Sequence, residues 1–208
     1  MTTLESTLDD LGIDVSTGRV VDFRAEELLR LHPEEGTVPL IYPTHITSGE
    51  VVWPKLEARK PSSIMVTNQS HDLLIPNETY TLVRRFSSKE EKRRVVAVLY
   101  EPHLLPATRI AFENHLNYFH QNLRGLDPLL AKGLTIFLNS TFVDMYFRLF
   151  NGHTQVNATD LRNMRYPTRR QLEELATHLP DGKTTQKMID VAIEEILFSM
   201  DNELDSSL

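Results

Sequence analysis

The chain has 208 residues, no cysteine and a formal net charge of −7 at pH 7. This length is sufficient for one sizeable domain with a real hydrophobic core, and the lack of cysteine excludes disulfides and thiolate zinc sites. No signal peptide and no long uninterrupted apolar run are seen, which predicts a soluble cytoplasmic protein without a membrane partner.

The acidic charge is concentrated at the two ends of the chain. Residues 1–36 carry 3 basic and 9 acidic side chains, and residues 169–208 carry 4 and 9, whereas residues 37–168 carry 15 and 11. The central segment is therefore mildly basic, which permits a polyanionic partner but does not demand one. An ordinary fluctuation in surface charge explains the same numbers.

The first 36 residues are predicted to be a lead-in from a preceding domain. The pattern favours a short helix over residues 3–15, a strand over 19–24, and a helix over 25–31 that ends at Pro33. This segment begins in mid-pattern and gathers little core of its own, so we expect it to link rather than to form a separate unit.

From residue 38 the sequence changes to short β-type runs separated by proline, glycine and asparagine. The predicted strands cover residues 38–42, 50–53, 63–67, 80–86, 95–100 and 109–112. Because no long helix intervenes, an antiparallel or mixed sheet is expected rather than a parallel βαβ series. The charged segment 87–94 is predicted to be a hairpin tip or loop.

Helices are predicted after the strands. Asp127-Pro128 has the residues of an N-cap and first helical position, and the dense apolar stretch 133–150 predicts a helix buried nearly all round, broken near Asn139-Ser140. Asn157 with Asp160, and Thr168 with Gln171, are typical of capping boxes. A last amphipathic helix is expected over 184–200.

These elements predict an α+β fold in which a short-stranded antiparallel or mixed sheet is followed by a buried helical pair and C-terminal helices. The expected organisation is a lead-in over 1–36, a central domain over 37–168 and a C-terminal helical segment over 169–208.

Several catalytic signatures are absent. The 8 glycines form no G-x-G-x-x-G or P-loop motif, and no G-x-S-x-G elbow occurs. His115 and His120 are five residues apart, which places them on opposite sides of a helix without a third ligand. We therefore predict no cofactor, metal or catalytic residue within this chain.

One nuclease-like set of residues is present. Asp72, Glu90 and Lys92 are of the types that hold Mg²⁺ and support an attacking water in phosphodiesterases. That chemistry needs the groups on a rigid strand, whereas Glu90 and Lys92 lie in a run of solvated charges, so a surface loop is the better interpretation.

Two polar clusters are candidates for ligand contacts. Residues 153–157, HTQVN, follow the apolar helix, and residues 113–122, ENHLNYFHQN, follow the last predicted strand. Amide, imidazole and hydroxyl side chains can bond phosphates and base edges. The alternative for each cluster is a polar loop whose side chains satisfy local backbone groups.

Six stretches of the chain together resemble a known family. They are residues 16–24 (STGRVVDFR), 38–43 (VPLIYP), 113–118 (ENHLNY), 138–141 (LNST), 152–161 (GHTQVNATDL) and 165–167 (RYP). This set, spread over residues 11 to 181, resembles the C-terminal part of adenine-specific DNA methyltransferases of bacterial restriction–modification systems, the region containing the TaqI-like specificity domain. A looser layout is similar to the specificity subunits of type I systems.

The resemblance implies a target-recognition domain that grips double-stranded DNA, while a separate catalytic methyltransferase domain binds S-adenosylmethionine and methylates N6 of a flipped adenine. The chain departs from the complete family pattern, because it has neither an Asn/Asp-Pro-Pro-Tyr/Phe motif nor a glycine-rich cofactor loop. The resemblance therefore implies a fragment of a longer enzyme or a separately encoded recognition piece.

With the resemblance, the polar clusters become candidate DNA contacts. The expected base or groove contacts are His153, Thr154, Gln155, Asn157, Asn114, His115, Asn117 and Tyr118. The expected phosphate contacts are Arg84, Arg85, Lys92, Arg93, Arg94, Arg162 and Arg165. Asn157 has the alternative role of a helix cap only, and Asn139 that of a turn residue.

Two other functions remain open from the sequence. One is a protein-interaction module that uses the acidic ends and the helical pair. The other is the recognition end of a fused restriction–methylation enzyme in which Asp72, Glu90 and Lys92 are catalytic.

Overall fold

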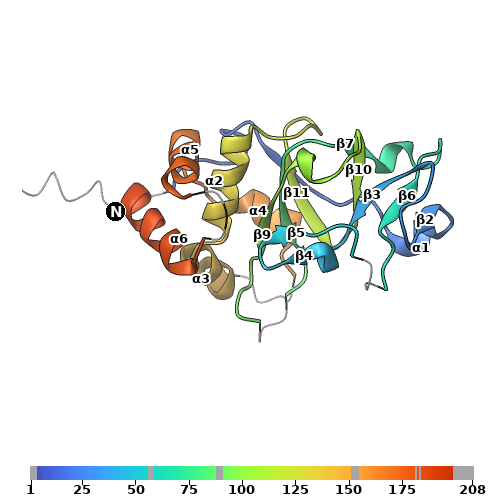
Figure 1. Ribbon diagram of the computed structural model, residues 1–208. Coiled ribbons are helices and arrows are strands. Elements are labelled where there is room, and N and C mark those ends of the chain that lie inside the picture. The colour runs from blue at the N-terminus through green and yellow to red at the C-terminus, as the bar shows by residue number, and fades with distance from the viewer. Residues whose placement is uncertain are drawn as a thin grey trace, which may run out of the picture.

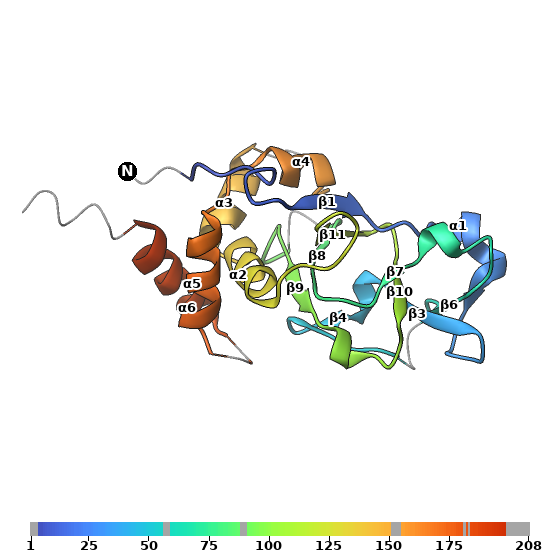
Figure 2. The same ribbon diagram turned by 90° about the horizontal axis from the view of Figure 1, so that it is seen from above.

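The computed structural model describes residues 4–55, 59–87, 91–150, 155–180, 182 and 184–198. The described elements form three layers, with helices on one face of a four-stranded sheet and a second sheet on its other face (Figures 1 and 2). No helix among these residues is long and apolar enough to cross a membrane.

The four-stranded sheet has the order β1-β11-β8-β9, and all neighbours are antiparallel. Its strands are β1 (Asp14–Thr17), β11 (Leu116–His120), β8 (Tyr80–Arg84) and β9 (Ala97–Tyr100). Side chains alternate between its faces. Val15, Val83 and Phe119 pack against the helices, whereas Leu82 and Tyr118 pack against the second sheet.

The second sheet is mixed and has the order β2-β6-β3-β10-β7, with β10 parallel to β3. Its strands are β2 (Leu29–Arg30), β6 (Ser63–Met65), β3 (Thr37–Ile41), β10 (Arg109–Phe112) and β7 (Ile75–Pro76). A separate hairpin consists of β4 (Ile46–Thr47) and β5 (Glu50–Val51). Short helical turns join the strands: α1 (Asp22–Ala25), η1 (Glu26–Leu28), η2 (Pro43–His45), η3 (His71–Leu73) and η4 (Pro102–Leu104).

The helical layer begins at α2 (Pro128–Leu138), where Asp127 Oδ1 accepts the backbone N–H groups of Leu129 and Leu130 at 3.1 and 3.2 Å. Asn139 ends α2 and bonds the backbone of β9, accepting the N–H of Ala97 at 3.1 Å and donating to its carbonyl at 2.9 Å. The remaining helices are α3 (Thr141–Phe150), α4 (Ala158–Asn163), α5 (Arg169–His178), α6 (Gln186–Ile193) and the π-helical η5 (Glu194–Phe198).

Helices α2 and α5 approach each other closely at Gly133. A Cβ atom on Gly133 would lie 1.8 Å from the carbonyl oxygen of Leu172, so only glycine allows this crossing. The core between the helices and the first sheet also includes Leu8 and Leu11 of the N-terminal segment. The described residues of all three predicted segments therefore share one hydrophobic core.

The predicted fold class is confirmed, and so are the α2 start, the break at Asn139-Ser140 and the α5 capping box. Several local predictions were wrong. Residues 8–12 form turns and residues 14–17 form β1, where a helix was expected. Residues 22–25 are helical rather than extended, and the helix expected over 25–31 is replaced by η1 and β2. Residues 116–120 of the second polar cluster form the inner strand β11. The last error arose because β11 takes its hydrogen bonds from β1 and β8, which are distant in sequence.

The prediction that residues 133–150 are buried nearly all round holds for α2 but not for α3. Phe142, Met145 and Leu149 lie on one face of α3 and are 41%, 56% and 75% exposed. Helix α3 packs on α2 and α6 with its other face, at the margin of the helical layer (Figure 1).

Candidate nucleic-acid interface

Three polar segments that are far apart in the sequence meet beside the C-terminal end of β8. Phe86 forms an antiparallel bridge with Gln155. The backbone N–H of Val156 donates to the carbonyl of Arg85 at 2.7 Å, and the N–H of Arg85 donates to the carbonyl of His115 at 2.8 Å. The end of β8, the β10–β11 turn and the segment before α4 therefore form one continuous surface.

We call this surface the polar edge and define it by Arg84, Arg85, Asn114, His115, Gln155 and Asn157. His115 is exposed, and the other five residues are half-buried. All six were predicted from the sequence as DNA contacts. They come from the three segments described above, which the structure brings together. His153 and Thr154, predicted in the same cluster, lie outside the described residues.

Arg85 lies at the centre of the polar edge. Its Nη1 donates to the carbonyl of Asn114 at 3.3 Å, its Nε donates to Asn157 Oδ1 at 3.4 Å, and its guanidinium lies 5.7 Å from the centroid of the Phe86 ring. Within the described ranges, no carboxylate forms an ion pair with Arg85. Its positive charge is therefore held in place by neutral groups and is available to an anion.

Arg84 differs from Arg85 because it has a carboxylate partner. Its Nη1 lies 3.4 Å from Glu91 Oε2, and both side chains are partly exposed. A long ion pair of this kind contributes little to stability. Arg84 can therefore exchange Glu91 for a phosphate without a large loss of folding free energy.

Asn157 has two roles in the structure. Its backbone N–H donates to Asp160 Oδ2 at 2.9 Å, which confirms the predicted capping box at the start of α4. Its side-chain Oδ1 also accepts from Arg85. The cap fixes the position of Asn157, and the side chain in turn helps to hold the central arginine.

The structure removes Asn117 and Tyr118 from the predicted DNA-facing set. Asn117 is fully buried, accepting from Thr17 Oγ1 at 3.1 Å and donating to the carbonyl of Val156 at 2.7 Å. Tyr118 is 1% exposed and packs against Tyr80 and Phe112 in the core between the sheets. Both belong to the inner strand β11, so their polar groups face the interior.

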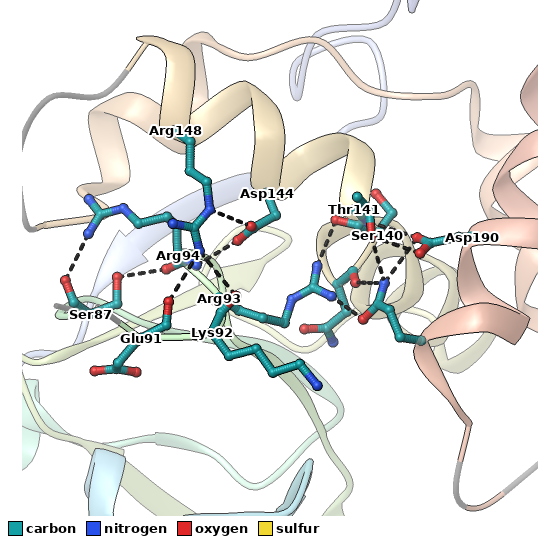
Figure 3. A network of polar contacts seen from close by, with 12 residues as sticks. Ser87, Glu91, Lys92, Arg93, Arg94, Ser140, Thr141, Asp144, Arg148 and Asp190 are labelled. Atoms are coloured by element: carbon teal, nitrogen blue, oxygen red, sulfur yellow. Dashed lines mark hydrogen bonds and ion pairs between the residues drawn. The ribbon is translucent and has the colours of Figure 1, made fainter. Parts of the chain in front are cut away.

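Arg93 and Arg94 are also removed, in this case from the phosphate candidates. Arg94 is 3% exposed; its backbone N–H donates to Asp144 Oδ1 at 2.6 Å and its Nη1 donates to the carbonyl of Ser87 at 2.8 Å. Arg93 Nη2 donates to the carbonyl of Ser140 at 2.7 Å, and its Nη1 bonds Gln186. Figure 3 shows the two side chains pointing in opposite directions.

These groups form what we call the arginine network, defined by Arg93, Arg94, Asp144, Arg148, Gln186 and Asp190. Arg148 Nε donates to Asp144 Oδ2 at 2.7 Å and its Nη2 donates to the carbonyl of Lys92 at 3.1 Å. Burial lowers the pKa of Arg93, and the Asp144 and Asp190 carboxylates oppose that effect. The arginine network fastens the segment after β8 to α3 and α6, which is a structural role.

Three further phosphate candidates remain exposed. Lys92 has an exposed side chain beside the arginine network. Arg162 Nη2 donates to the carbonyl of Val15 at 2.7 Å, and Arg165 Nη1 donates to the carbonyl of Glu5 at 3.1 Å. Arg162 Nε also lies 3.5 Å from Asp14 Oδ1. Arg162 and Arg165 therefore tie the α4 region to the N-terminal segment.

Of the nuclease-like residues, the structure describes Asp72 and Lys92 and places them on different segments. Asp72 lies on η3 with its side chain 98% exposed beside His71, whereas the backbone of Lys92 contacts Arg148. Glu90 lies outside the described residues. In the part of the chain that is described, no group of three or more acidic or histidine side chains is placed to hold a metal ion.

Two residues of this surface were missed as functional from the sequence. Glu113 is 1% exposed, and its carboxylate contacts the His115 ring. Phe86 is 38% exposed, and its ring centroid lies 4.9 Å from that of His115. The Glu-Asn-His order gave a weak signal for the first contact, but nothing local indicated the second.

Comparison with known proteins places similar chains among Type II methyltransferases. The chain is 50% identical over 194 residues to the Type II methyltransferase M.PstI of Providencia stuartii, covering 93% of this chain and 38% of that protein. It is 47% identical over 195 residues to the Type II methyltransferase M.BsuBI of Bacillus subtilis, covering 93% and 39%. The chain thus spans about two fifths of the length of these curated relatives, and no family model matches it.

A solved structure shares the fold. The type IIG restriction endonuclease BpuSI superposes with a TM-score of 0.57 at 12% sequence identity, covering 97% of this chain and 30% of that chain. At this identity the likeness concerns the fold alone. The same arrangement of strands and helices therefore occurs within a longer polypeptide.

Proposed function

We propose that this chain is the DNA-sequence recognition part of an S-adenosylmethionine-dependent N6-adenine DNA methyltransferase. The single observation that carries the proposal is the convergence of Arg84–Arg85, Asn114–His115 and Gln155–Asn157 at the C-terminal end of β8 in the first sheet. The similarity to part of two Type II methyltransferases supports it.

The polar edge combines the two kinds of contact that sequence-specific DNA binding requires. The guanidinium groups of Arg84 and Arg85 would hold phosphates and set position and affinity, without reading sequence. The amides of Asn114 and Gln155 and the imidazole of His115 offer donors and acceptors to base edges in the major groove. The rigid backbone bonds between the three segments keep these groups in a fixed relation.

The proposal keeps the TaqI-like specificity region for this chain, and it assigns methyl transfer and the binding of S-adenosylmethionine to a catalytic domain outside these residues. The chain contains no glycine-rich cofactor loop and no Asn/Asp-Pro-Pro-Tyr/Phe motif, so its residues do not fit that cofactor. Within the chain we keep residues 37–168 as the part that contacts DNA, because the polar edge falls inside these limits.

The proposal is tested by measuring the binding of this chain to labelled DNA duplexes at increasing salt. The affinity should fall steeply, because each phosphate contact releases counterions and contributes a slope of about −0.9 in log K against log salt. A parallel selection from randomised duplexes should enrich a defined site. Replacement of His115 or Gln155 by alanine should alter the enriched bases while leaving the fold intact.

Three results would contradict parts of the proposal. Affinity that does not change with salt would exclude a phosphate-gripping surface. Selection without an enriched sequence would exclude a recognition role. An enriched site that contains no adenine on either strand would exclude N6-adenine methylation as the partner reaction while leaving DNA recognition in place.

A further inference from the structure

Phe86 is a large apolar side chain that lies among the groups of the polar edge. Its ring is 38% exposed, whereas Phe112, Phe119 and Phe137 are 2% exposed or less and belong to the core. A ring that stays in water to this extent forgoes part of the free energy that burial provides. Exposure alone identifies no ligand, because single exposed apolar side chains are common on protein surfaces. The surroundings of the Phe86 ring are more informative.

Two members of the polar edge pack against this ring. The centroid of the His115 ring lies 4.9 Å from that of Phe86, with the planes inclined at 50°. The guanidinium carbon of Arg85 lies 5.7 Å from the Phe86 centroid. These distances are typical of aromatic and cation–π contacts. Phe86 is therefore the apolar member of a cluster of three planar groups, and flat groups of this kind are the ones on which nucleobases stack.

The backbone on both sides of the ring is fixed. Phe86 forms an antiparallel bridge with Gln155. The next residue, Ser87, is 3% exposed, and its Oγ donates to the carbonyl of Arg94 at 2.9 Å. Arg94 Nη1 donates in return to the carbonyl of Ser87 at 2.8 Å. A shift of the Phe86 ring towards the core would break these bonds, so the arginine network helps to keep the ring at the surface.

Two other phenylalanines in the described part of the chain are exposed, and their surroundings differ. Phe23 is 77% exposed on the four-residue helix α1, where the guanidinium carbon of Arg24 lies 5.4 Å from its ring centroid. Phe142 is 41% exposed on α3, and its ring packs against that of Phe198 at 5.5 Å and 50°. Phe142 thus matches Phe86 in exposure and in ring contact, but it belongs to the helical layer rather than to the cluster beside the polar edge.

We propose that Phe86 stacks on the face of a nucleobase in the bound DNA, and that the duplex is opened at that step to admit the ring. This inference rests on the proposed function and adds a stacking contact to the phosphate and base-edge contacts of the polar edge. The face of a base is covered by its neighbours in a closed duplex, so contact with it requires local unstacking. Arg85 lies against the ring, where it would hold a phosphate beside the opened step.

The opening has an energetic role in the proposed function. An enzyme that modifies a base outside the stack must meet the cost of unstacking. Stacking on an aromatic side chain returns part of that cost, and it does so with little dependence on the identity of the base, because every base has a π-face. Phe86 would therefore help to open the duplex, whereas the amides and His115 would select the sequence.

The test uses the duplex enriched by selection, with 2-aminopurine placed at one position at a time. This base fluoresces weakly within a stack and more strongly when its neighbours separate. We expect binding of the wild-type chain to raise the fluorescence at one step and to leave the rest of the site unchanged. Because the proposed catalytic domain lies outside this chain, the opening measured here would come from the recognition part itself.

Three variants isolate the ring, each checked for folding by circular dichroism and thermal unfolding. Phe86→Leu keeps an apolar side chain but has no flat face, so it should lose the fluorescence rise and bind about tenfold more weakly. Phe86→Tyr keeps the face and should retain both properties. Phe142→Leu makes the same change at an equally exposed ring on α3 and should behave as the wild type.

The outcomes separate this inference from the proposed function. A folded Phe86→Leu chain with wild-type affinity and fluorescence would overturn the inference, and salt-dependent, sequence-selective binding by the same chain would leave the proposed function intact. Weaker binding by Phe86→Leu without a fluorescence rise at any position for the wild type would show an apolar contact in a groove, which also overturns the inference. Equal losses in Phe86→Leu and Phe142→Leu would overturn it as well. Lack of duplex binding at every salt concentration would overturn both proposals.

Discussion

The first arginines of the polar edge and of the arginine network, Arg84 and Arg93, are nine residues apart, yet the two regions use arginine in opposite ways. Arg85 is half-buried among carbonyl and amide oxygens and forms no ion pair within the described residues. Arg93 and Arg94 lie in a network with the Asp144 carboxylate at its centre. Neither the number of arginines nor their position in a charged run distinguishes a binding surface from a structural one. What distinguishes the two is how deeply each arginine is buried and which groups accept its hydrogen bonds.

The largest expected effect concerns the centre of the arginine network. Asp144→Ala removes the acceptor for the Arg94 backbone N–H and the partner of Arg148, leaving buried polar groups without their bonds. We expect a loss of about 3–5 kcal/mol in the free energy of unfolding, measured by urea denaturation. Duplex affinity, measured on the folded fraction, should change much less.

Two controls sharpen this prediction. Asp144→Asn keeps an oxygen for the Arg94 N–H and should cost less than alanine. Glu173→Ala breaks the exposed pair with Arg169, which is also 2.7 Å long, and should change stability by less than about 1 kcal/mol. Equal losses at Asp144 and Glu173 would show that the network has no special structural role.

The next prediction concerns the pH dependence of folding stability that arises from a second buried polar group. His45 is fully buried, and its Nδ1 accepts the backbone N–H of Tyr42 at 3.0 Å. Burial, with a smaller effect of Lys55, lowers the pKa of His45 to about 4. The unfolded chain therefore binds this proton more readily than the folded one, so the contribution to stability is complete above about pH 6.5 and is lost as the pH falls towards 4.

The expected loss over that interval is about 3 kcal/mol. It is measured as the difference between urea denaturation series for the wild type and for His45→Gln, which keeps an acceptor oxygen but does not titrate. The pH dependence of stability between 6.5 and 4 should be shallower in the variant. Parallel curves for the two chains would contradict the assignment.

The smallest expected effect is at the polar edge. Arg85→Ala should leave stability nearly unchanged but weaken duplex binding, and it should make the slope of log K against log salt less steep by about one phosphate contact. Arg169→Ala removes the same charge from α5, in the helical layer, and should leave that slope unchanged. If both variants reduce the slope equally, net charge rather than the polar edge controls binding.

Local sequence signals predicted the helical part of the fold. The helix-start signals each act over three or four residues, so a short sequence window contains everything that determines where the helix begins. These signals are Asp127-Pro128, the Asn157–Asp160 box and the Thr168–Gln171 box. Strand β11 could not be predicted in the same way. Residues of β11 pair with residues 32 to 38 positions away in β8 and about a hundred positions away in β1, and Asn117 and His120 gave the strand the composition of a loop.

The sequence predicted which types of residue form the candidate site, but it did not predict correctly which individual residues belong to it. The sequence indicated Arg85, Asn114, His115, Gln155 and Asn157, which the structure brings together. It also indicated Asn117, Tyr118, Arg93 and Arg94, which the structure buries. No local pattern distinguishes an amide that faces solvent from one that bonds a distant carbonyl, because that outcome depends on packing between elements.

The close crossing at Gly133 sets a limit on transplanting this surface into another scaffold. Helix α5 touches the backbone of α2 there, and α2 in turn bonds β8 through Thr81, whose hydroxyl donates to the carbonyl of Ala131 at 2.9 Å. A graft that stops at residue 168 would lack α5, so one face of α2 would lose its packing partner and β8, which ends in Arg84, would be held less firmly. The minimal portable unit therefore extends through α5, well beyond the residues that would touch DNA.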